Sequence, residues 1–196
     1  MKKQLILSIG REFGSGGHEV AELLASKLGI QLLDDNLLHN LASEKNVSCE
    51  ELQKYDEKPK AIFFSRTVAG YTNAMEEHLA KMQFKYLKKL ADEGQSFVIV
   101  GRCAEHVLKN YPCMISVFIL GNSEAKCERL VKKYHVSREE ALKLMKKNDL
   151  KRKTYHNYYC DGKWGDSRNY DLCVNSSDIG IQGTAGIILE YINRVR

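Results

Sequence analysis

A glycine-rich segment near the N-terminus has the residue types of a phosphate-binding loop. Gly14, Gly16 and Gly17 follow a short apolar run and precede an amphipathic helical pattern. Glycines at such a junction let the backbone turn tightly and aim consecutive N–H groups at one anion, and the following helix N-terminus favours negative charge. The cluster could instead be a simple tight turn. Its position between a first strand and a first helix favours the phosphate-binding interpretation.

The loop lacks the lysine that ends the common phosphate-binding pattern G-x-x-x-x-G-K-[ST]. Gly17 stands at the lysine position, and His18 stands where the Mg²⁺-holding hydroxyl is expected. Phosphoryl transfer would therefore need a cation from elsewhere in the chain. Arg11 is in the same loop, and Arg102 follows an apolar strand-like run, where a planar guanidinium could hold two phosphate oxygens. The alternatives are a solvated loop arginine at Arg11 and a salt bridge at the sheet edge at Arg102.

A third basic group, Lys151 to Lys153, lies within a lysine-rich run that begins at Lys146 and is followed by tyrosines and Trp164. Basic residues interleaved with aromatic ones could bind nucleic acid or could be a solvated helix face. They could also form a mobile lid that brings an arginine to a transferring phosphoryl group. Spacing alone leaves all three open, although the small net charge of +5 and the shortness of the cluster make nucleic acid the least favoured.

Two carboxylates, Asp34 and Asp35, close the second strand-like run. A carboxylate at this edge could position a Mg²⁺ shell or accept a hydrogen bond from a substrate hydroxyl. Asp35 equally fits an N-cap for a helix that starts near Asn36. We therefore expect Asp34 to be the functional carboxylate of the pair.

Five apolar, β-branched runs predict the strands that must position these residues. They cover residues 4–9, 30–33, 96–100, 114–120 and 171–174. Helical patterns separate them, one after Gly17 that ends at Gly29 and others at about 123–134, 138–153 and 182–195. Near-continuous apolar strands alternating with helices are typical of a parallel sheet covered on both faces. The sequence therefore predicts an α/β fold.

We expect a single domain with two inserted segments. The predicted core covers residues 1–35, 95–147 and 169–196, with a helical insertion at about 36–94 and a lid at about 148–168. Within the insertion, apolar residues recur at helical spacing and predict core packing; they are Met75, Leu79, Met82, Tyr86 and Leu90. The sequences Ser48 to Glu51 and Ser137 to Glu140 fit capping boxes.

Composition excludes several classes of protein. The chain has 196 residues, 43% of them hydrophobic, which is enough to bury one sizeable core and argues against disorder. No apolar run approaches the roughly 20 residues that span a bilayer, and the start shows no signal-peptide cleavage site, so we expect a cytoplasmic protein without a membrane partner. Six scattered cysteines without a C-x-x-C pair indicate reduced thiols. Histidine spacing predicts no structural metal.

The motifs together resemble the cytidylate kinase-like branch of the P-loop nucleoside monophosphate kinases. The stretches that carry the resemblance are 8–17, 98–102, 148–155, 162–166 and 169–177, and they run through nearly the whole chain. The resemblance implies a P-loop NTPase-type five-stranded parallel sheet with helices on both faces, a helical acceptor-binding insertion and a small lid.

The resemblance also implies roles for individual residues. The donor-phosphate loop would be Gly14, Ser15, Gly16, Gly17 and the adjacent His18. Arg102 would bind the acceptor phosphate, and Arg152, with Asp149 nearby, would be the lid arginine that stabilises the transferring group. Asn175 to Ser177 would lie beside the donor base. The chain departs from the family where the loop lysine is absent and where Val100 replaces the acidic residue of an Asp-Gly-Arg sequence.

The implied activity is ATP-dependent phosphoryl transfer to a nucleoside monophosphate, with CMP or dCMP as the first expected acceptor. Mg²⁺ would be held through the nucleotide, and Arg11, Arg102 and Arg152 would be the catalytic cations. The alternative is a sensor or partner-binding module that binds ATP or ADP and has lost phosphoryl transfer, which the missing loop lysine would explain. The sequence does not indicate the oligomeric state.

Overall fold

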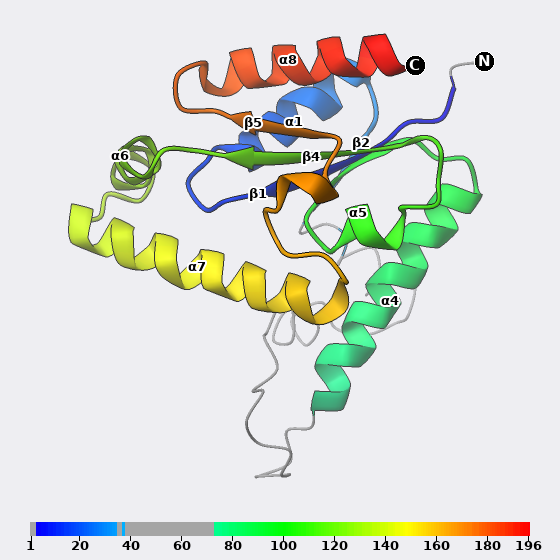
Figure 1. Cartoon of the computed structure of the whole chain (residues 1–196), viewed down its shortest axis with the longest axis horizontal. Helices are drawn as coiled ribbons and strands as arrows, with labels where there is room; N and C mark the ends of the chain where they lie inside the picture. The colour runs from blue at the N-terminus through cyan, green and yellow to red at the C-terminus, as the bar shows by residue number, and fades with distance from the viewer. Residues whose placement is uncertain (1–2, 35–36, 38–72) are drawn as a thin grey trace.

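Five parallel strands form the centre of the molecule, with helices on both faces (Figure 1). The computed structural model describes residues 3–34, 37 and 73–196. The strands are β1 (Ile6–Arg11), β2 (Gln31–Leu33), β3 (Phe97–Val100), β4 (Met114–Leu120) and β5 (Leu172–Asn175). The helices are α1 (Gly17–Leu28), α4 (Asn73–Asp92), α5 (Ala104–Val107), α6 (Ser123–Tyr134), α7 (Arg138–Tyr159) and α8 (Gly180–Val195), with a short 3₁₀ turn at Ser167–Asn169.

The strand order is β2-β3-β1-β4-β5, which makes β1 the central strand. Ser8 of β1 pairs with Ile99 of β3 on one side and with Ser116 of β4 on the other, and every pairing is parallel. The carboxyl ends of the strands therefore meet at one edge of the sheet. The segments that follow β1, β3 and β4 lie together there, which is where ligands bind in open α/β sheets.

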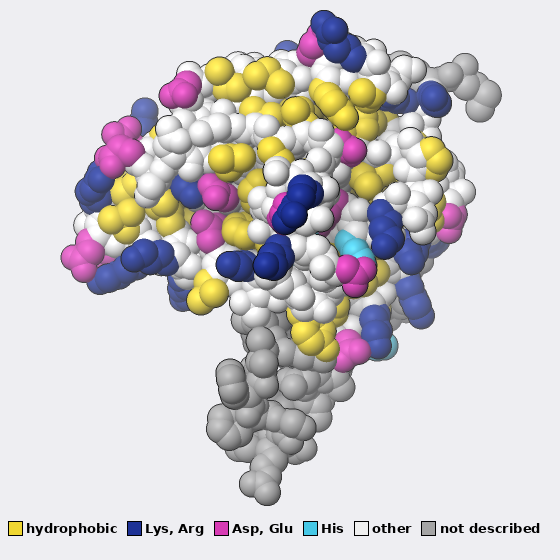
Figure 2. Space-filling model, viewed as in Figure 1, with side chains coloured by type: hydrophobic (Ala, Val, Ile, Leu, Met, Phe, Trp, Pro, Cys, Tyr) yellow, Lys and Arg dark blue, Asp and Glu magenta, His cyan; other side chains and the backbone are white. Residues whose placement is uncertain are grey.

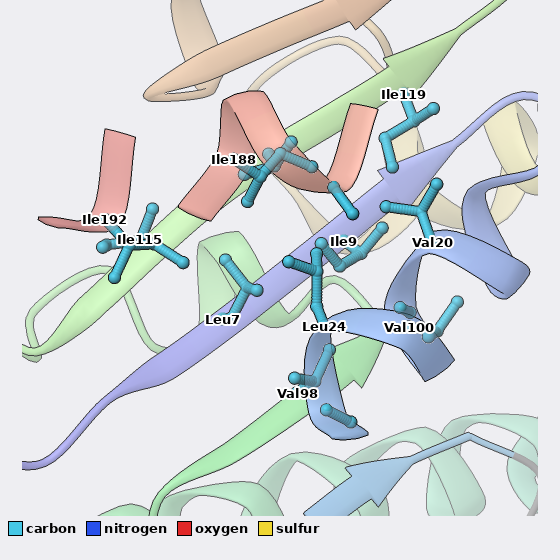
Figure 3. Packing of buried hydrophobic residues seen from close by; sticks show 14 of the residues in the cluster. Leu7, Ile9, Val20, Leu24, Val98, Val100, Ile115, Ile119, Ile188 and Ile192 are labelled. Carbon is cyan, nitrogen blue, oxygen red and sulfur yellow. The ribbon is translucent and has the colours of Figure 1, made fainter. Parts of the chain in front are cut away.

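Successive side chains along each strand point to opposite faces of the sheet, so the apolar residues are divided between two cores. Leu7 and Ile9 point toward α1 and α8, where they pack with Leu24 and Ile188 (Figure 3). Ile6 belongs to a second cluster on the opposite face, under α4 and α5. Figure 1 shows α1 and α8 on one side of the sheet and α4, α5 and α7 on the other. Because β1 contributes to both cores, the loop that follows it begins from a rigid base.

The predicted elements are confirmed, with shifts at their ends. All five predicted strands are present, and Ser137 and Glu140 form the predicted capping box, in which the Ser137 hydroxyl accepts from the Glu140 N–H. Helix α7 continues to Tyr159, six residues past its predicted end at residue 153. Burial of Tyr155 and His156 explains the extension, because tertiary packing often overrides weak local propensity.

Two other expectations concern the insertion and the cysteines. Leu79 and Leu90 of α4 are buried in the second cluster, as their spacing predicts. Most of the predicted insertion, Asp35 and the Ser48 capping box lie outside the described residues. The five described cysteines are free thiols. Among the described helices, none is both long enough and apolar enough to cross a membrane.

Replacing Leu24 with alanine tests the first core. Leu24 is fully buried between α1 and the sheet, so Leu24→Ala is expected to lower the free energy of unfolding by about 3 kcal/mol. Leu150→Ala is the control, because Leu150 is 65% exposed and should change stability by less than about 0.5 kcal/mol. Urea denaturation of both variants measures the difference, and equal losses would show that the core is misassigned.

Candidate functional site

The glycine loop leads directly into the N-terminus of α1. Gly14 and Gly16 adopt positive φ angles of 83° and 77°, which side chains other than glycine rarely tolerate. Gly16 is the residue before the helix and provides no side-chain cap. The first-turn N–H groups of a helix have no acceptors within the helix, so those that follow Gly16 can bind an anion.

A cavity of about 420 Å³ opens beside this loop, within the size range of small-molecule sites. Among the described residues, six basic and three acidic side chains line it. The basic ones are Arg11, Arg102, Arg129, Lys133, Lys151 and Arg152, and the acidic ones are Glu12, Glu19 and Asp34. This excess of positive charge over a helix N-terminus suits a polyphosphate.

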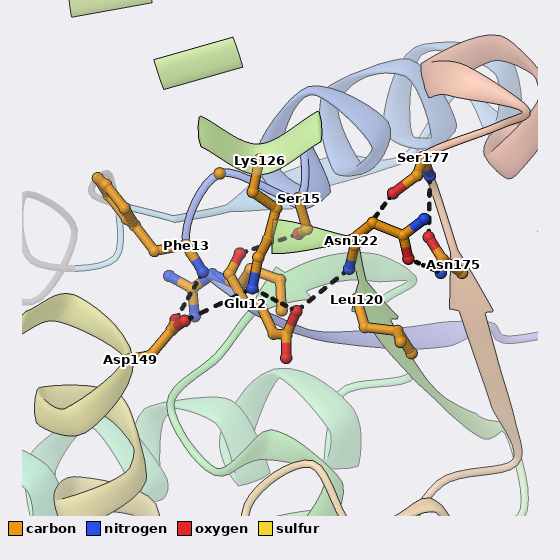
Figure 4. A network of polar contacts seen from close by, with 12 residues as sticks. Glu12, Phe13, Ser15, Leu120, Asn122, Lys126, Asp149, Asn175 and Ser177 are labelled. Carbon is orange, nitrogen blue, oxygen red and sulfur yellow. Dashed lines mark hydrogen bonds and ion pairs between the residues drawn. The ribbon is translucent and has the colours of Figure 1, made fainter. Parts of the chain in front are cut away.

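An ion pair between Lys126 of α6 and Glu12 anchors the loop from behind (Figure 4). The Lys126 Nζ lies 2.8 Å from the Glu12 Oε2, and that oxygen also accepts from the Gly121 N–H at 3.1 Å. The Lys126 side chain is only 9% exposed. It reaches a second carboxylate at 3.9 Å, that of Asp149 in α7. One ammonium group therefore connects the loop, the end of β4 and α7.

Asp149 continues this network to the loop backbone. Its Oδ1 accepts from the Phe13 N–H at 2.6 Å. Burial raises the pKa of Asp149, and the Phe13 N–H and Lys126 oppose that rise because they stabilise the carboxylate. Asp149, predicted as a substrate-binding residue, is not among the residues that line the cavity. In the structure it fixes the loop.

Two further contacts hold the loop from β5 and α6. The Ser176 hydroxyl, which follows β5, donates to the Ser15 carbonyl at 2.5 Å and is fully buried. The Arg129 Nη1 donates to the Gly14 carbonyl at 2.5 Å. The loop conformation is therefore fixed before any ligand binds, which lowers the entropic cost of binding.

Arg102 lies in a tight turn at the end of β3. Gly101, Arg102 and Cys103 all have left-handed backbone angles, with φ of 74°, 60° and 53°. Such angles are uncommon outside glycine and are typical of functional sites. The turn directs Arg102 into the cavity lining, although only 6% of the residue is exposed. A β-carbon at position 101 would collide with the Arg11 guanidinium.

Arg152 brings α7 to the loop. Its Nη1 donates to the Arg11 carbonyl at 3.2 Å, and its guanidinium carbon lies 5.4 Å from the centre of the Phe13 ring. This distance is typical of a cation–π contact. Arg11, Arg102 and Arg152, predicted from three separate segments, thus line one cavity.

Asp34 and His18 also line the cavity. The His18 Nε2 lies 3.6 Å from the Asp34 Oδ2 and 3.4 Å from the Glu22 Oε1. The imidazole therefore occupies the opening of α1, where the common pattern has a hydroxyl.

Asn175 and Ser177 lie away from the cavity lining. They contact Asn122 instead: the Asn175 Nδ2 donates to its Oδ1 at 2.9 Å, and the Ser177 Oγ accepts from its N–H at 2.7 Å. These contacts join the segment after β5 to the segment after β4 (Figure 4). A role beside a donor base remains a prediction for both residues.

Sequence reasoning missed the contribution of α6. Lys126, Arg129 and Lys133 are spaced i, i+3 and i+7, so they share one face of the predicted helix, and that spacing was the available signal. Lys133 pairs with Glu19 of α1 at 2.6 Å. Burial alone would raise the pKa of Glu19, but this ion pair lowers it. Ser176 belongs to the segment 175–177 that the resemblance places beside a donor base, but no signal in the sequence indicated its contact with the Ser15 carbonyl.

Comparisons with known proteins agree with this fold. In structure, the chain resembles shikimate kinase from Bacteroides thetaiotaomicron, with a TM-score of 0.57, 12% identity and coverage of 96% and 98% of the two chains. An uncharacterized protein from Eubacterium ventriosum is more similar, with a TM-score of 0.78, 39% identity and coverage of 97% and 99%. The fold is therefore that of the P-loop-type kinases, as predicted.

The sequence identifies the family within this class. The model of the cytidylate kinase-like family matches residues 6–178. Cytidylate kinase from Pyrococcus horikoshii is 26% identical over 196 residues, covering 99% of this chain and 91% of that protein. The chain belongs to the cytidylate kinase-like family, and its homologues support a kinase-like phosphotransferase function at the level of the family.

Replacing Lys126 tests the anchor of the loop. Lys126→Met leaves two largely buried carboxylates, Glu12 and Asp149, without their shared cation, so the free energy of unfolding should fall by about 2 kcal/mol. Lys132→Met on the exposed side of α6 is the control and should have little effect. Thermal and chemical denaturation measure both, and a fully stable Lys126→Met protein would contradict the proposed anchoring.

Proposed function

We propose that this chain is an ATP-dependent nucleoside monophosphate kinase, with CMP or dCMP as its first expected acceptor. The observation that carries the proposal is a single cavity in which Arg102 and Arg152 lie with the glycine loop and the N-terminus of α1. One part of this lining suits a donor polyphosphate, and the arginines suit a second phosphate group. Membership of the cytidylate kinase-like family supports the nucleotide as the substrate class.

In the proposed reaction, an acceptor phosphate oxygen attacks the γ-phosphorus of ATP. A new P–O bond forms to the acceptor, the bond to the β,γ-bridging oxygen breaks, and its electron pair leaves with ADP. The loop N–H groups hold the donor β-phosphate, Arg102 holds the acceptor, and Arg152 stabilises the transferring group. Catalysis is then mainly positioning and electrostatic stabilisation.

The cation that replaces the missing loop lysine is proposed to be Arg129. Its guanidinium already contacts the Gly14 carbonyl, and it lies 3.3 Å from where a β-carbon on Gly16 would be. Lys133 is one turn further along α6 but is paired with Glu19. Arg11 is near the turn that carries Arg102, closer to the acceptor side. Arg129 therefore has the best position to meet the donor phosphates.

The described residues fit a Mg²⁺ ion that is held mainly by the nucleotide. Magnesium usually takes most ligands from water and phosphate and one or two from protein carboxylates. Asp34, which follows β2 and lies 3.6 Å from the His18 Nε2, is the carboxylate of the lining proposed to take part in the Mg²⁺ shell. Bound Mg²⁺ would neutralise charge on the β- and γ-phosphates.

A nucleotide-binding module without transfer activity is the second candidate. The replacement of the loop lysine by Gly17 favours it, because a positive charge pre-placed on the β- and γ-phosphates contributes to transition-state stabilisation. This candidate predicts ATP or ADP binding by calorimetry and no ADP formation with any acceptor.

Nucleic-acid binding has less support. Figure 2 shows Lys and Arg side chains interspersed with acidic ones along α6 and α7, with no continuous basic stripe on this face. Lys151 and Arg152 line the cavity. Exposed lysines on α7 include Lys143, which pairs with Glu139 at 2.7 Å.

The first experiment is ADP release from ATP and Mg²⁺ with CMP, dCMP, UMP, AMP or GMP as acceptor. Turnover should depend on the acceptor, and Arg152→Ala should lower kcat about 10³-fold while changing ATP affinity less than about threefold. Arg138→Ala is the control, since Arg138 is an exposed residue of the same helix. Unchanged turnover in Arg152→Ala would remove Arg152 from the mechanism, and ATP binding without turnover would support the binding module.

Arg129→Gln tests the replacement of the loop lysine. Loss of a charge-assisted contact to phosphate should weaken ATP binding about tenfold or more, whereas Arg129→Lys should retain part of the affinity. Lys132→Gln on the exposed side of α6 controls for the general loss of charge. Isothermal titration calorimetry gives all three affinities, and equal values for Arg129→Gln and Lys132→Gln would exclude Arg129 as the donor cation.

A further inference from the structure

Four potential metal ligands are buried together on the α5 face of the sheet. Glu105 and His156 are 8% and 6% exposed, and the His156 Nε2 lies 2.7 Å from the Glu105 Oε1. Three ligand atoms, one each from Glu105, His156 and Cys160, lie within 4.8 Å of one another. Cys103 and Cys160 belong to the same small buried cluster. The cluster therefore contains two sulfurs, one imidazole nitrogen and one carboxylate.

This set of donor atoms matches the ligands that zinc prefers. Zinc binds sulfur at about 2.3 Å and nitrogen or oxygen at about 2.0–2.1 Å, with tetrahedral geometry. Ligand atoms in such a site are roughly 3.3–3.8 Å apart. The ligand atoms of Glu105, His156 and Cys160 lie within 4.8 Å of one another, so small side-chain movements would bring these three to such separations.

The surroundings of His156 fix the ring in the orientation that a metal needs. Its Nδ1 faces the Asn157 Oδ1 at 3.3 Å, and that oxygen also accepts from the Trp164 N–H at 2.8 Å. A hydrogen bond at Nδ1 leaves Nε2 directed at Glu105 and available to a metal. Histidine ligands in metal sites usually have such a partner on their second nitrogen.

We propose that Cys103, Glu105, His156 and Cys160 form a binding site for a zinc-type divalent cation. Histidine spacing alone misses this site, because the ligand paired with His156 of α7 is a cysteine, Cys160, which directly follows the last residue of the helix. The other two ligands come from the turn after β3 and the first turn of α5. The metal would join these two parts of the chain, and it would do so whatever the phosphoryl acceptor is.

The site is adjacent to the two arginines of the cavity. Cys103 directly follows Arg102, and His156 is one helical turn after Arg152. The space between these groups is a small recess lined by Arg102, Glu105, Arg152 and His156, among other residues. A metal ion would therefore fix the separation between the ends of α5 and α7 and hold both arginines in place.

Cobalt binding to the full-length protein tests the proposal. The protein is first stripped with a chelator under reducing conditions and then titrated with Co²⁺. We expect one equivalent to bind with the intense charge-transfer absorption of cobalt–thiolate bonds and the visible bands of a tetrahedral site, and zinc to displace it. Elemental analysis of zinc-loaded protein should give one zinc per chain, and its melting temperature should rise with free zinc.

Matched variants assign the signal to this cluster. Cys160→Ser should lower Co²⁺ affinity about a hundredfold or more and weaken the thiolate bands, while Cys127→Ser, which alters a buried thiol on α6 outside the cluster, should leave both unchanged. If Cys160→Ser fails to fold, the wild-type spectrum still decides. A spectrum without thiolate bands, absence of stoichiometric uptake, or a Cys103–Cys160 disulfide forming in place of metal binding would each overturn the proposal.

Discussion

The ion pair between Lys126 and Glu12 is the contact on which the rest of the site depends. A glycine loop gains its ability to bind anions only when its backbone is held in one conformation, and glycine itself resists being held. Here the ammonium of a helix distant in sequence fixes the loop from behind, through Glu12 and, by way of Asp149, through the Phe13 N–H. Lys126 therefore stabilises the loop from behind, and the cations of the cavity lining are the groups proposed to replace the charge of the absent loop lysine.

The fold could be predicted from the sequence because local signals and burial agree. The strand run 114–120 is apolar at every position except Ser116, and the Ser137 capping box marks the start of its helix. The end of α7 could not be predicted, since it depends on burial of Tyr155 and His156 against α5. A four-residue helix such as α5 is too short to leave a periodic pattern in the sequence.

Site residues next to strand ends could be predicted from the sequence. Site residues whose role depends on tertiary contacts could not. Arg11 ends β1 and Arg102 lies just after β3, and the carboxyl ends of these strands must share an edge, so their convergence follows from the topology. Lys126 contacts a residue 114 positions earlier, and no local pattern contains that information. Asp149 shows the converse. The resemblance predicts it as a substrate-binding residue beside Arg152, but its carboxylate contacts the loop backbone and an ammonium.

The turn at residues 101–103 has a consequence for how freely this sequence can vary. At Gly101 the positive φ and the contact with the Arg11 guanidinium exclude side chains for two independent reasons. Arg102 and Cys103 hold the same strained backbone with side chains present, so their neighbours must supply the energy that keeps them there. Changes to the packing around this turn would therefore alter which substitutions the protein accepts at all three positions. Natural variation or engineering is more easily accommodated on exposed stretches of α6 and α7.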